Sequence, residues 1–170
     1  LEIGDSFSFR GPNGRLEYMG DGVFNIKQLK SQGGEIIEKK VKNVGMIAGG
    51  TGITPMIQII RAVLRNENDP TKLSLLFANK EERDIILRDK LENPDRDFSD
   101  RFEVHYTLDK AEDGWSGFTG FIDEEMIRNT MPEPSDDTLI LLCGPPKMNS
   151  EAVKPALESI GYSPDSIFNF

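Results

Sequence analysis

The segment Val44-Gly-Met-Ile-Ala-Gly-Gly-Thr-Gly-Ile-Thr-Pro55 decides the fold of this chain. It begins as an apolar strand, breaks into a glycine-rich loop and continues into an apolar helical pattern. A second segment of this kind, Leu139-Ile-Leu-Leu-Cys-Gly-Pro-Pro-Lys-Met148, lies near the other end of the chain. Two such segments predict a parallel α/β sheet, with both loops at the rim where these sheets bind ligands.

Strand and helix patterns alternate from Val44 to the end of the chain. The strands are expected at 44–48, 72–78, 102–108, 138–143 and 167–170, and the helices near 55–66, 81–92, 122–130 and 146–160. Right-handed crossovers then predict a doubly wound, five-stranded parallel sheet of order 3-2-1-4-5. In this order the first and fourth strands are neighbours, so the two loops meet where the strand order reverses.

The residues before this alternation read as short strands. We expect strands at 6–10, 15–18 and 23–26, separated by the turns Gly11-Pro-Asn-Gly14 and Gly20-Asp-Gly22. Three short strands do not form a stable domain alone. We therefore interpret 1–28 as the last strands of a truncated β-barrel, 29–42 as a linker and 43–170 as a nucleotide-binding α/β domain.

Composition excludes several classes of protein. The net charge of −9 argues against a nucleic-acid-binding protein, which needs a basic surface. The single cysteine cannot form an internal disulfide, and no Cys/His cluster suggests a metal site. The lone His105 lies inside an expected strand, where a structural role is expected. The chain begins in mid-pattern without Met, so we interpret it as part of a longer protein.

The loop Gly49-Gly-Thr-Gly52 and the residues that follow form a candidate ligand site. Glycine lets a ligand approach the backbone where a Cβ would clash. Thr54 is a candidate N-cap, and Pro55 suits the first helical position. The free N–H groups at the helix start favour a pyrophosphate. Because the spacing differs from G-x-G-x-x-G, a tight turn without a ligand is the alternative.

The other strand ends supply further candidates. Cys143 either packs against a ligand ring or is a small buried apolar residue, and no neighbouring base suggests a nucleophile. Phe77 and Asn79 end the second strand, either near the ligand or in the core. Asp109 can accept from a ribose 2′-hydroxyl and repel a 2′-phosphate, which favours NADH, or it can simply form a turn. The aromatic Phe170 either reaches a planar ring or closes the sheet edge.

Residues 27–42 are locally basic. They contain five lysines and two glutamates, a balance of 5 − 2 = +3 within the acidic chain. The lysines are Lys27, Lys30, Lys39, Lys40 and Lys42. The segment is either a solvated loop or a docking patch for an acidic partner.

These motifs together resemble the NADH–cytochrome b5 reductase family of the ferredoxin reductase superfamily, over nearly the whole chain. The matching segments are Gly11-Pro-Asn-Gly14, Gly49-Gly-Thr-Gly-Ile-Thr-Pro55, Phe77-Ala-Asn79, Tyr106-Thr-Leu-Asp-Lys110, Gly120-Phe-Ile-Asp-Glu-Glu-Met-Ile-Arg128, Cys143-Gly-Pro-Pro146 and Phe170. The reductase module of nitrate reductase is similar and is the nearest alternative. A non-catalytic NADH-binding module is a further alternative.

The resemblance implies a two-domain enzyme, in which an N-terminal barrel holds FAD and this α/β domain holds NADH. It implies hydride transfer from NADH to FAD, followed by single-electron transfer to cytochrome b5. The cytosolic face is the expected location, with an anchor in the endoplasmic reticulum or mitochondrial outer membrane through a segment absent here. The acidic cytochrome b5 is the partner expected at the lysines of 27–42.

The resemblance also implies roles for individual residues. Thr51 and Cys143 are expected at the reacting nicotinamide, Asp109 at the ribose and Phe170 near the flavin edge. The full set expected at the cofactor is Gly49, Gly50, Thr51, Gly52, Thr54, Pro55, Phe77, Asn79, Asp109, Cys143, Gly144, Pro145, Met148 and Phe170.

Two departures from the family pattern matter. The Arg-x-Tyr-Ser/Thr-Pro flavin motif and the glycine-rich segment that meets the flavin pyrophosphate are absent, so the chain alone is expected to hold FAD poorly and to be inactive. Lys147 stands where the family usually has a third proline, which adds a positive charge near the rim.

Overall fold

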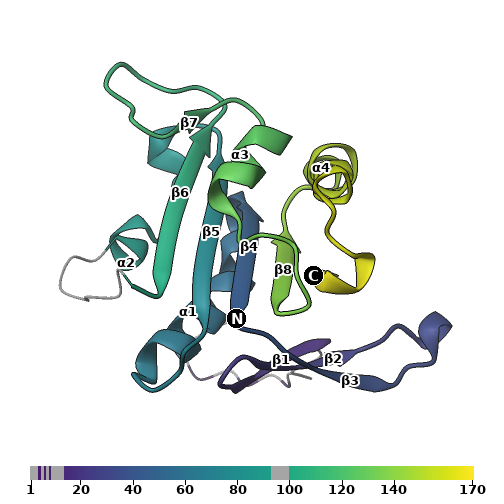
Figure 1. Ribbon diagram of the computed structural model, residues 1–170. Coiled ribbons are helices and arrows are strands. Elements are labelled where there is room, and N and C mark those ends of the chain that lie inside the picture. The colour runs from purple at the N-terminus through teal and green to yellow at the C-terminus, as the bar shows by residue number, and fades with distance from the viewer. Residues whose placement is uncertain (1–3, 5, 7, 9–13, 93–99) are drawn as a thin grey trace.

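The computed structural model of the chain describes residues 4, 6, 8, 14–92 and 100–170 (Figure 1). The expected strand at 6–10 and most of the turn Gly11-Pro-Asn-Gly14 lie outside the described residues.

A small antiparallel sheet precedes the α/β domain. Its strands are β1 (Leu16–Gly20), β2 (Val23–Lys27) and β3 (Ile36–Lys40), in the order β1-β2-β3. The strands expected at 15–18 and 23–26 are confirmed. The expectation that 29–42 is only a linker is wrong, because β3 lies within it and pairs with β2. The charged residues around Ile36 and Ile37 gave no strand pattern in the sequence. Pairing with β2 nevertheless stabilises a strand there.

Among the described residues, the main sheet is parallel and has six strands. They are β4 (Asn43–Gly49), β5 (Lys72–Asn79), β6 (Phe102–Leu108), β7 (Phe118–Thr119), β8 (Thr138–Cys143) and β9 (Ile167–Asn169). Their order is β7-β6-β5-β4-β8-β9. The predicted order 3-2-1-4-5 is confirmed for the five expected strands. The count of five is corrected to six, because β7 is too short to show an alternating pattern.

The helices are α1 (Ile53–Arg65), α2 (Arg88–Leu91), α3 (Glu124–Thr130) and α4 (Lys154–Ile160). Short 3-10 turns occur at Lys30–Gln32, Gly50–Gly52, Glu82–Asp84 and Pro164–Ser166, and a π-helical turn at Met148–Val153 leads into α4. The helix expected over 81–92 is not continuous. Leu87 has a left-handed φ of 60°, which separates the 3-10 turn at Glu82 from α2.

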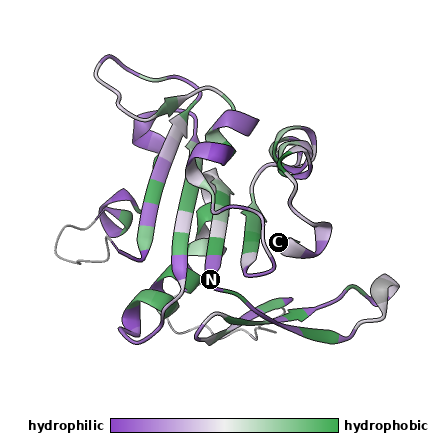
Figure 2. Cartoon of the chain, in the orientation of Figure 1, coloured by the Kyte–Doolittle hydropathy of each residue, from purple (hydrophilic) through white to green (hydrophobic). Residues whose placement is uncertain are grey.

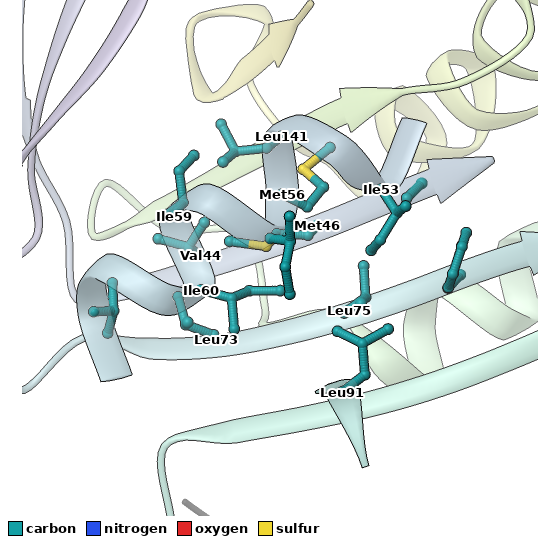
Figure 3. Close-up of a cluster of buried hydrophobic side chains, with 14 of the residues drawn as sticks. Val44, Met46, Ile53, Met56, Ile59, Ile60, Leu73, Leu75, Leu91 and Leu141 are labelled. Carbon is teal, nitrogen blue, oxygen red and sulfur yellow. The ribbon is translucent and has the colours of Figure 1, made fainter. Parts of the chain in front are cut away.

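Helices cover both faces of the main sheet, which is the doubly wound arrangement (Figure 1). One face packs against α1, whose Ile53, Met56 and Ile60 contact apolar side chains of β4 and β5 (Figure 3). The other face packs against α3 and α4, through residues such as Ile127 and Leu157. Hydrophobic residues accordingly follow the central strands, whereas the visible side of α3 is hydrophilic (Figure 2).

The small sheet packs on the α1 side of the main sheet. Phe24 of β2 is fully buried there. A buried polar cluster at the same end joins the sheet to the loop between α1 and β5. In it, Tyr18 donates to the carboxylate of Asp69, and Thr71 donates to the other oxygen through its N–H (3.0 Å) and its hydroxyl (2.6 Å). The small sheet is therefore attached to the α/β domain by both apolar and polar contacts.

Within the described part of the chain, no helix combines the length and hydrophobicity that a membrane span requires.

Candidate functional site

The two loops that open the sequence argument meet in space. β4 and β8 are neighbouring parallel strands, with Ala48 level with Cys143. Their carboxyl ends therefore lie side by side at one rim of the sheet, where the strand order reverses. This is the position at which doubly wound sheets bind nucleotides.

Glycine is required here partly because the two loops press on each other. A Cβ added to Gly52 would lie 2.0 Å from the carbonyl oxygen of Cys143. One added to Gly49 would lie 2.7 Å from Cδ of Pro145 and 2.8 Å from Sδ of Met148. At these two positions the absent side chain makes room for protein rather than for a ligand. This finding modifies the expectation that all three glycines admit a ligand.

Gly50 and Thr51 form the open part of the first loop. Gly50 has a φ of +52°, and a Cβ there would have no described heavy atom within 4 Å. Thr51 is exposed. The expectation that Thr54 is the N-cap and Pro55 the first helical residue is wrong. α1 begins at Ile53, because a 3-10 turn at Gly50–Gly52 precedes it.

No side chain within the described part of the chain caps the start of α1. The Thr54 hydroxyl donates to the carbonyl of Thr51 at 3.0 Å instead of accepting from the helix backbone. An uncapped start of a 13-residue helix, next to an open loop, suits a pyrophosphate.

Asn79 ends β5 at the same rim, and its side chain is buried with its polar atoms unsatisfied by the described residues. Its side chain is only 6% exposed, yet neither its Nδ2 nor its Oδ1 has a hydrogen-bond partner among the described residues. A buried amide without partners is costly unless a ligand or water completes it. A bound nucleotide at this rim would supply such a partner.

Phe77 lies two residues earlier on the same strand, with its side chain in the core. It is fully buried in the α1-side core, and its ring centroid is 6.2 Å from that of Tyr106. Of the two alternatives for Phe77, this burial favours a place in the core, and its expected contact with the ligand stays a prediction.

Asp109 follows β6 and is exposed at the rim. Its N–H donates to the carbonyl of Asn79 at 3.0 Å, and the N–H of Lys110 donates to the carbonyl of Lys80 at 2.9 Å. These bonds extend the β5–β6 pairing beyond the strands and hold Asp109 beside Asn79. The carboxylate is thus available to a ribose hydroxyl.

Phe121 is a rim residue that the sequence reasoning did not select. Its side chain is 80% exposed, the largest value among the described large hydrophobic residues. The preceding Gly120 donates to the carbonyl of Leu108 at 2.8 Å, which places Phe121 near the end of β6 and Asp109. An aromatic residue after glycine in a polar loop was the available signal.

Cys143 is half-buried at the end of β8 and packs against the α1-side core. Burial raises the pKa of its thiol. A thiol that stays protonated in an apolar environment acts as a packing surface rather than as a nucleophile. This fits contact with a nicotinamide ring.

Phe170 follows β9 and lies beside the end of β8. Its N–H donates to the carbonyl of Leu142 at 3.1 Å, and its ring meets that of Phe168 edge-on at 5.0 Å. Its side chain is 46% exposed, so part of the ring remains available to a ligand.

The structure therefore brings nearly all predicted site residues to one rim. On the β4–β8–β9 side lie the loop at Gly49–Gly52, the turn Cys143–Pro145, Met148 and Phe170. On the β5–β6 side lie Asn79 and Asp109. Two groups of polar and aromatic residues along one rim suit a ligand with two ends, such as a dinucleotide.

The basic segment does not form one lysine patch. Lys39 lies on the inner face of β3, where its Nζ donates to the carbonyl of Asp165 at 3.0 Å. Burial lowers the pKa of Lys39. Lys42 forms an ion pair with Asp137 at 2.6 Å. Of the five, only Lys27, Lys30 and Lys40 have no ion pair or side-chain hydrogen bond with the described residues.

A doubly wound sheet with an uncapped helix start and a strand-end carboxylate at its rim defines the class of dinucleotide-binding domains. Comparison with known proteins agrees with this class. The sequence pattern of the oxidoreductase NAD-binding domain matches residues 46–154, and the chain belongs to this family.

The chain is similar to several reductases along its whole length. It is 51% identical to NADH-cytochrome b5 reductase 3 of Rattus norvegicus and covers 56% of that protein. It is 49% identical to NADH-cytochrome b5 reductase 1 of Bos taurus and covers 55% of it. In both cases 100% of this chain is aligned. The chain thus spans a little over half the length of these relatives.

Solved structures give the same result for the fold. The cytochrome b5 reductase domain of Ulva prolifera nitrate reductase superposes with a TM-score of 0.86 at 38% identity, covering 95% of this chain and 59% of that one. A flavohemoglobin from Malassezia yamatoensis shares the fold with a TM-score of 0.62 at 21% identity, over 76% of this chain and 31% of that one. A ferredoxin reductase in carbazole 1,9a-dioxygenase also superposes, with a TM-score of 0.55 at 26% identity over 75% of this chain and 37% of that one, so the fold is ferredoxin reductase-like.

Proposed function

We propose that this chain is the NADH-binding domain of a flavoprotein oxidoreductase that takes hydride from NADH and passes electrons to cytochrome b5. The observation that carries the proposal is the shared rim of β4, β5, β6 and β8, where a helix start, an unpartnered amide and a carboxylate lie together. The choice of reaction is supported by the names of relatives that share about half of their aligned residues with this chain.

Each part of the rim has a role in holding the nucleotide. The N-terminus of α1 binds the pyrophosphate through backbone N–H groups and the helix dipole. Asp109 accepts from the ribose 2′-hydroxyl, and its charge disfavours a 2′-phosphate. Asn79 completes its hydrogen bonds on the nucleotide. Thr51 and the half-buried thiol of Cys143 border the nicotinamide and fix the plane of the ring.

These residues orient the donor but cannot separate its two electrons. Bound FAD would supply the conversion from two-electron to one-electron transfer. We assign its binding mainly to another part of the whole protein, because this sequence lacks the family's flavin motif. The small sheet, up to residue 40, is proposed as the end of that flavin-binding part. The sequence predicted domain boundaries after residues 28 and 42. We propose instead a single boundary, between β3 and β4.

The nucleotide site can be tested by titrating the chain with NADH and NADPH in calorimetry. The wild type should bind NADH more tightly than NADPH. Asp109→Ala should weaken NADH binding by roughly tenfold, the value of one hydrogen bond to a charged group, and should reduce the preference over NADPH. Asp113→Ala, an exposed carboxylate in the next loop, is the matched control. Equal binding of both nucleotides by the wild type would contradict the role of Asp109.

The docking of cytochrome b5 is proposed for the outer face of the small sheet. Lys40 lies opposite Val23 in the β2–β3 pairing, on the same face as Lys27, and neither has an ion-pair partner among the described residues. These lysines suit an acidic surface. The proposed cellular place of the whole protein, the cytosolic face of the endoplasmic reticulum or mitochondrial outer membrane, rests on the family resemblance.

Charge reversal distinguishes a docking role from a general charge effect. In the flavin-loaded reductase, Lys27→Glu with Lys40→Glu should raise the Michaelis constant for cytochrome b5 and flatten its dependence on salt. The Michaelis constant for NADH should stay unchanged. Lys90→Glu, on α2 at the far edge of the main sheet, is the control for a single reversed charge. The Michaelis constant should respond less to Lys90→Glu than to Lys27→Glu or Lys40→Glu made alone. An equal response would end the proposal.

A second candidate is the reductase module of a nitrate reductase, favoured by the superposition on the Ulva prolifera domain. The nucleotide site would then be the same, and only the electron acceptor would differ. Reduction of cytochrome b5 by the NADH-reduced whole protein supports the first candidate. Nitrate-dependent oxidation of NADH supports the second.

A further inference from the structure

Arg15 joins the small sheet to the opposite end of the chain. Its backbone is held by the N–H of Lys27, which donates to the Arg15 carbonyl at 2.7 Å. Its guanidinium Nη2 donates to the carbonyl of Asn169 at 2.9 Å. The same guanidinium lies over the ring of Phe168, 5.0 Å from the ring centroid. One side chain thus holds two consecutive residues of β9.

The contacts continue from Asn169 to the turn at the nucleotide rim. The Oδ1 of Asn169 accepts from Nδ2 of Asn149 at 3.2 Å. Asn149 Nδ2 also lies 3.3 Å from the carbonyl of Gly144, to which it donates. Asn149 is only 7% exposed, so this link is shielded from water. A polar path therefore runs from Arg15 through Asn169 and Asn149 to the residue after Cys143.

Phe170 directly follows this strand. β9 has only three residues and pairs along one edge, with β8. A strand this short, paired along one edge only, frays unless side-chain contacts hold it. The Arg15 contacts and the edge-on pairing of Phe168 with Phe170 supply such contacts. The position of the Phe170 ring at the rim therefore depends on Arg15.

We propose that Arg15 is a positioning residue for hydride transfer. It holds β9 and, through Asn169 and Asn149, the Cys143–Gly144 turn, so that Phe170 and Cys143 together fix the nicotinamide ring. Arg15 touches neither the nucleotide nor the reacting atoms and acts only through these residues. The inference rests on the proposed function, since it assumes that the nicotinamide lies between the turn and the C-terminus.

The test uses Arg15→Leu in the flavin-loaded reductase. Loss of ring orientation should lower kcat for NADH oxidation by about tenfold, because small displacements of reacting groups strongly reduce transfer rates. The dissociation constant for NAD⁺ should change by less than about twofold, since the pyrophosphate and ribose contacts remain. Arg65→Leu, an exposed arginine at the end of α1, removes the same charge and is the control. It should leave both quantities unchanged.

Hydrogen–deuterium exchange gives a readout that does not need turnover. The C-terminal peptide from Ser163 to Phe170 should exchange faster in Arg15→Leu than in the wild type or in Arg65→Leu. Arg15→Lys should restore this protection only in part, because lysine keeps the charge but not the planar guanidinium over the Phe168 ring. This conservative variant carries the test if Arg15→Leu fails to fold.

A kinetic cycle checks the path itself. Arg15→Leu and Asn149→Ala act through the same Asn169, so their combined effect on kcat should be smaller than the product of the single effects. Unchanged kcat and unchanged C-terminal exchange in folded Arg15→Leu would overturn the inference. Failure of the wild type to bind NADH would instead overturn the proposed function.

Discussion

Cys143 is the only thiol of the chain, which allows its chemistry to be measured directly. It lies half-buried between the apolar core and the rim, and burial raises the pKa of the thiol above its ordinary value. The thiolate is the reactive form, so the fraction available near neutral pH is small.

We expect iodoacetamide to modify Cys143 more slowly than a free thiol with a pKa of about 8.5, at any pH below that value. The rate should rise toward that of the free thiol only at higher pH, where the raised pKa of Cys143 is passed. Bound NADH should slow the reaction further by covering the thiol. Mass spectrometry of the labelled fraction against pH measures this. Rapid labelling at neutral pH would show that Cys143 is an activated thiolate.

At this scale the sequence could identify strand ends but not the surroundings of each side chain. Phe77 and Asn79 stand two residues apart on β5, and both were expected near the ligand. α1 and Tyr106 cover Phe77, whereas the amide of Asn79 lacks a partner among the described residues. This difference depends on packing from other elements, which no local pattern contains.

Among the elements, the loops after β4 and β8 are the most demanding. The backbone of Gly52 approaches the carbonyl of Cys143 so closely that no side chain fits between them. Each loop therefore fixes the other, and the helix start that faces the ligand depends on this contact.

Gly52→Ala should destabilise the fold by roughly 3 kcal/mol, because the new methyl would force two backbone segments apart. Gly50→Ala should cost only about 1 kcal/mol, since space is open there and the residue need only adopt a left-handed φ. Urea unfolding followed by circular dichroism gives both values. Equal losses for the two variants would mean that the loops separate readily.

Element type was predictable where the pattern was long. The apolar stripe of α1 and the runs in β4 and β8 gave their positions closely, because buried strands and sheet-covering helices need such patterns. β3 was missed because its residues are mostly polar. The helix expected over 81–92 was interrupted because Glu81 and Asp84 form a capping box around a 3-10 turn, and Leu87 then takes a positive φ.

For the whole molecule, the junction between the two sheets depends on one buried carboxylate. Asp69 is 1% exposed. Burial alone would raise the pKa of Asp69, but hydrogen bonds from Thr71, Tyr18 and the Asp21 backbone outweigh it and hold the pKa below the usual value. The ionised form is therefore favoured in the folded state.

This shift predicts loss of stability in acid. The pKa of Asp69 is lower in the folded state than in the unfolded state, where it is about 3.9. The ionised carboxylate therefore contributes fully to the free energy of unfolding above about pH 3.9. This contribution is lost as the pH falls through the folded pKa. Asp69→Asn should lower the free energy of unfolding at neutral pH by roughly 2 kcal/mol, and the difference from wild type should shrink in acid. Urea unfolding at neutral pH and in acid tests this prediction, with Asp113→Asn at an exposed position as control. A difference that stays constant with pH would contradict it.

The pairing of β4 with β8 also determines when the site can exist during synthesis. β4 begins at Asn43 and β8 only at Thr138, so the first loop leaves the ribosome long before its neighbour is made. Until β8 arrives, the edge of β4 that faces it has unpaired backbone groups, and non-local parallel pairs of this kind form slowly. A nascent chain therefore passes through a stage in which chaperones can bind this edge. A nucleotide can assist folding only late in synthesis, after β8 has been made.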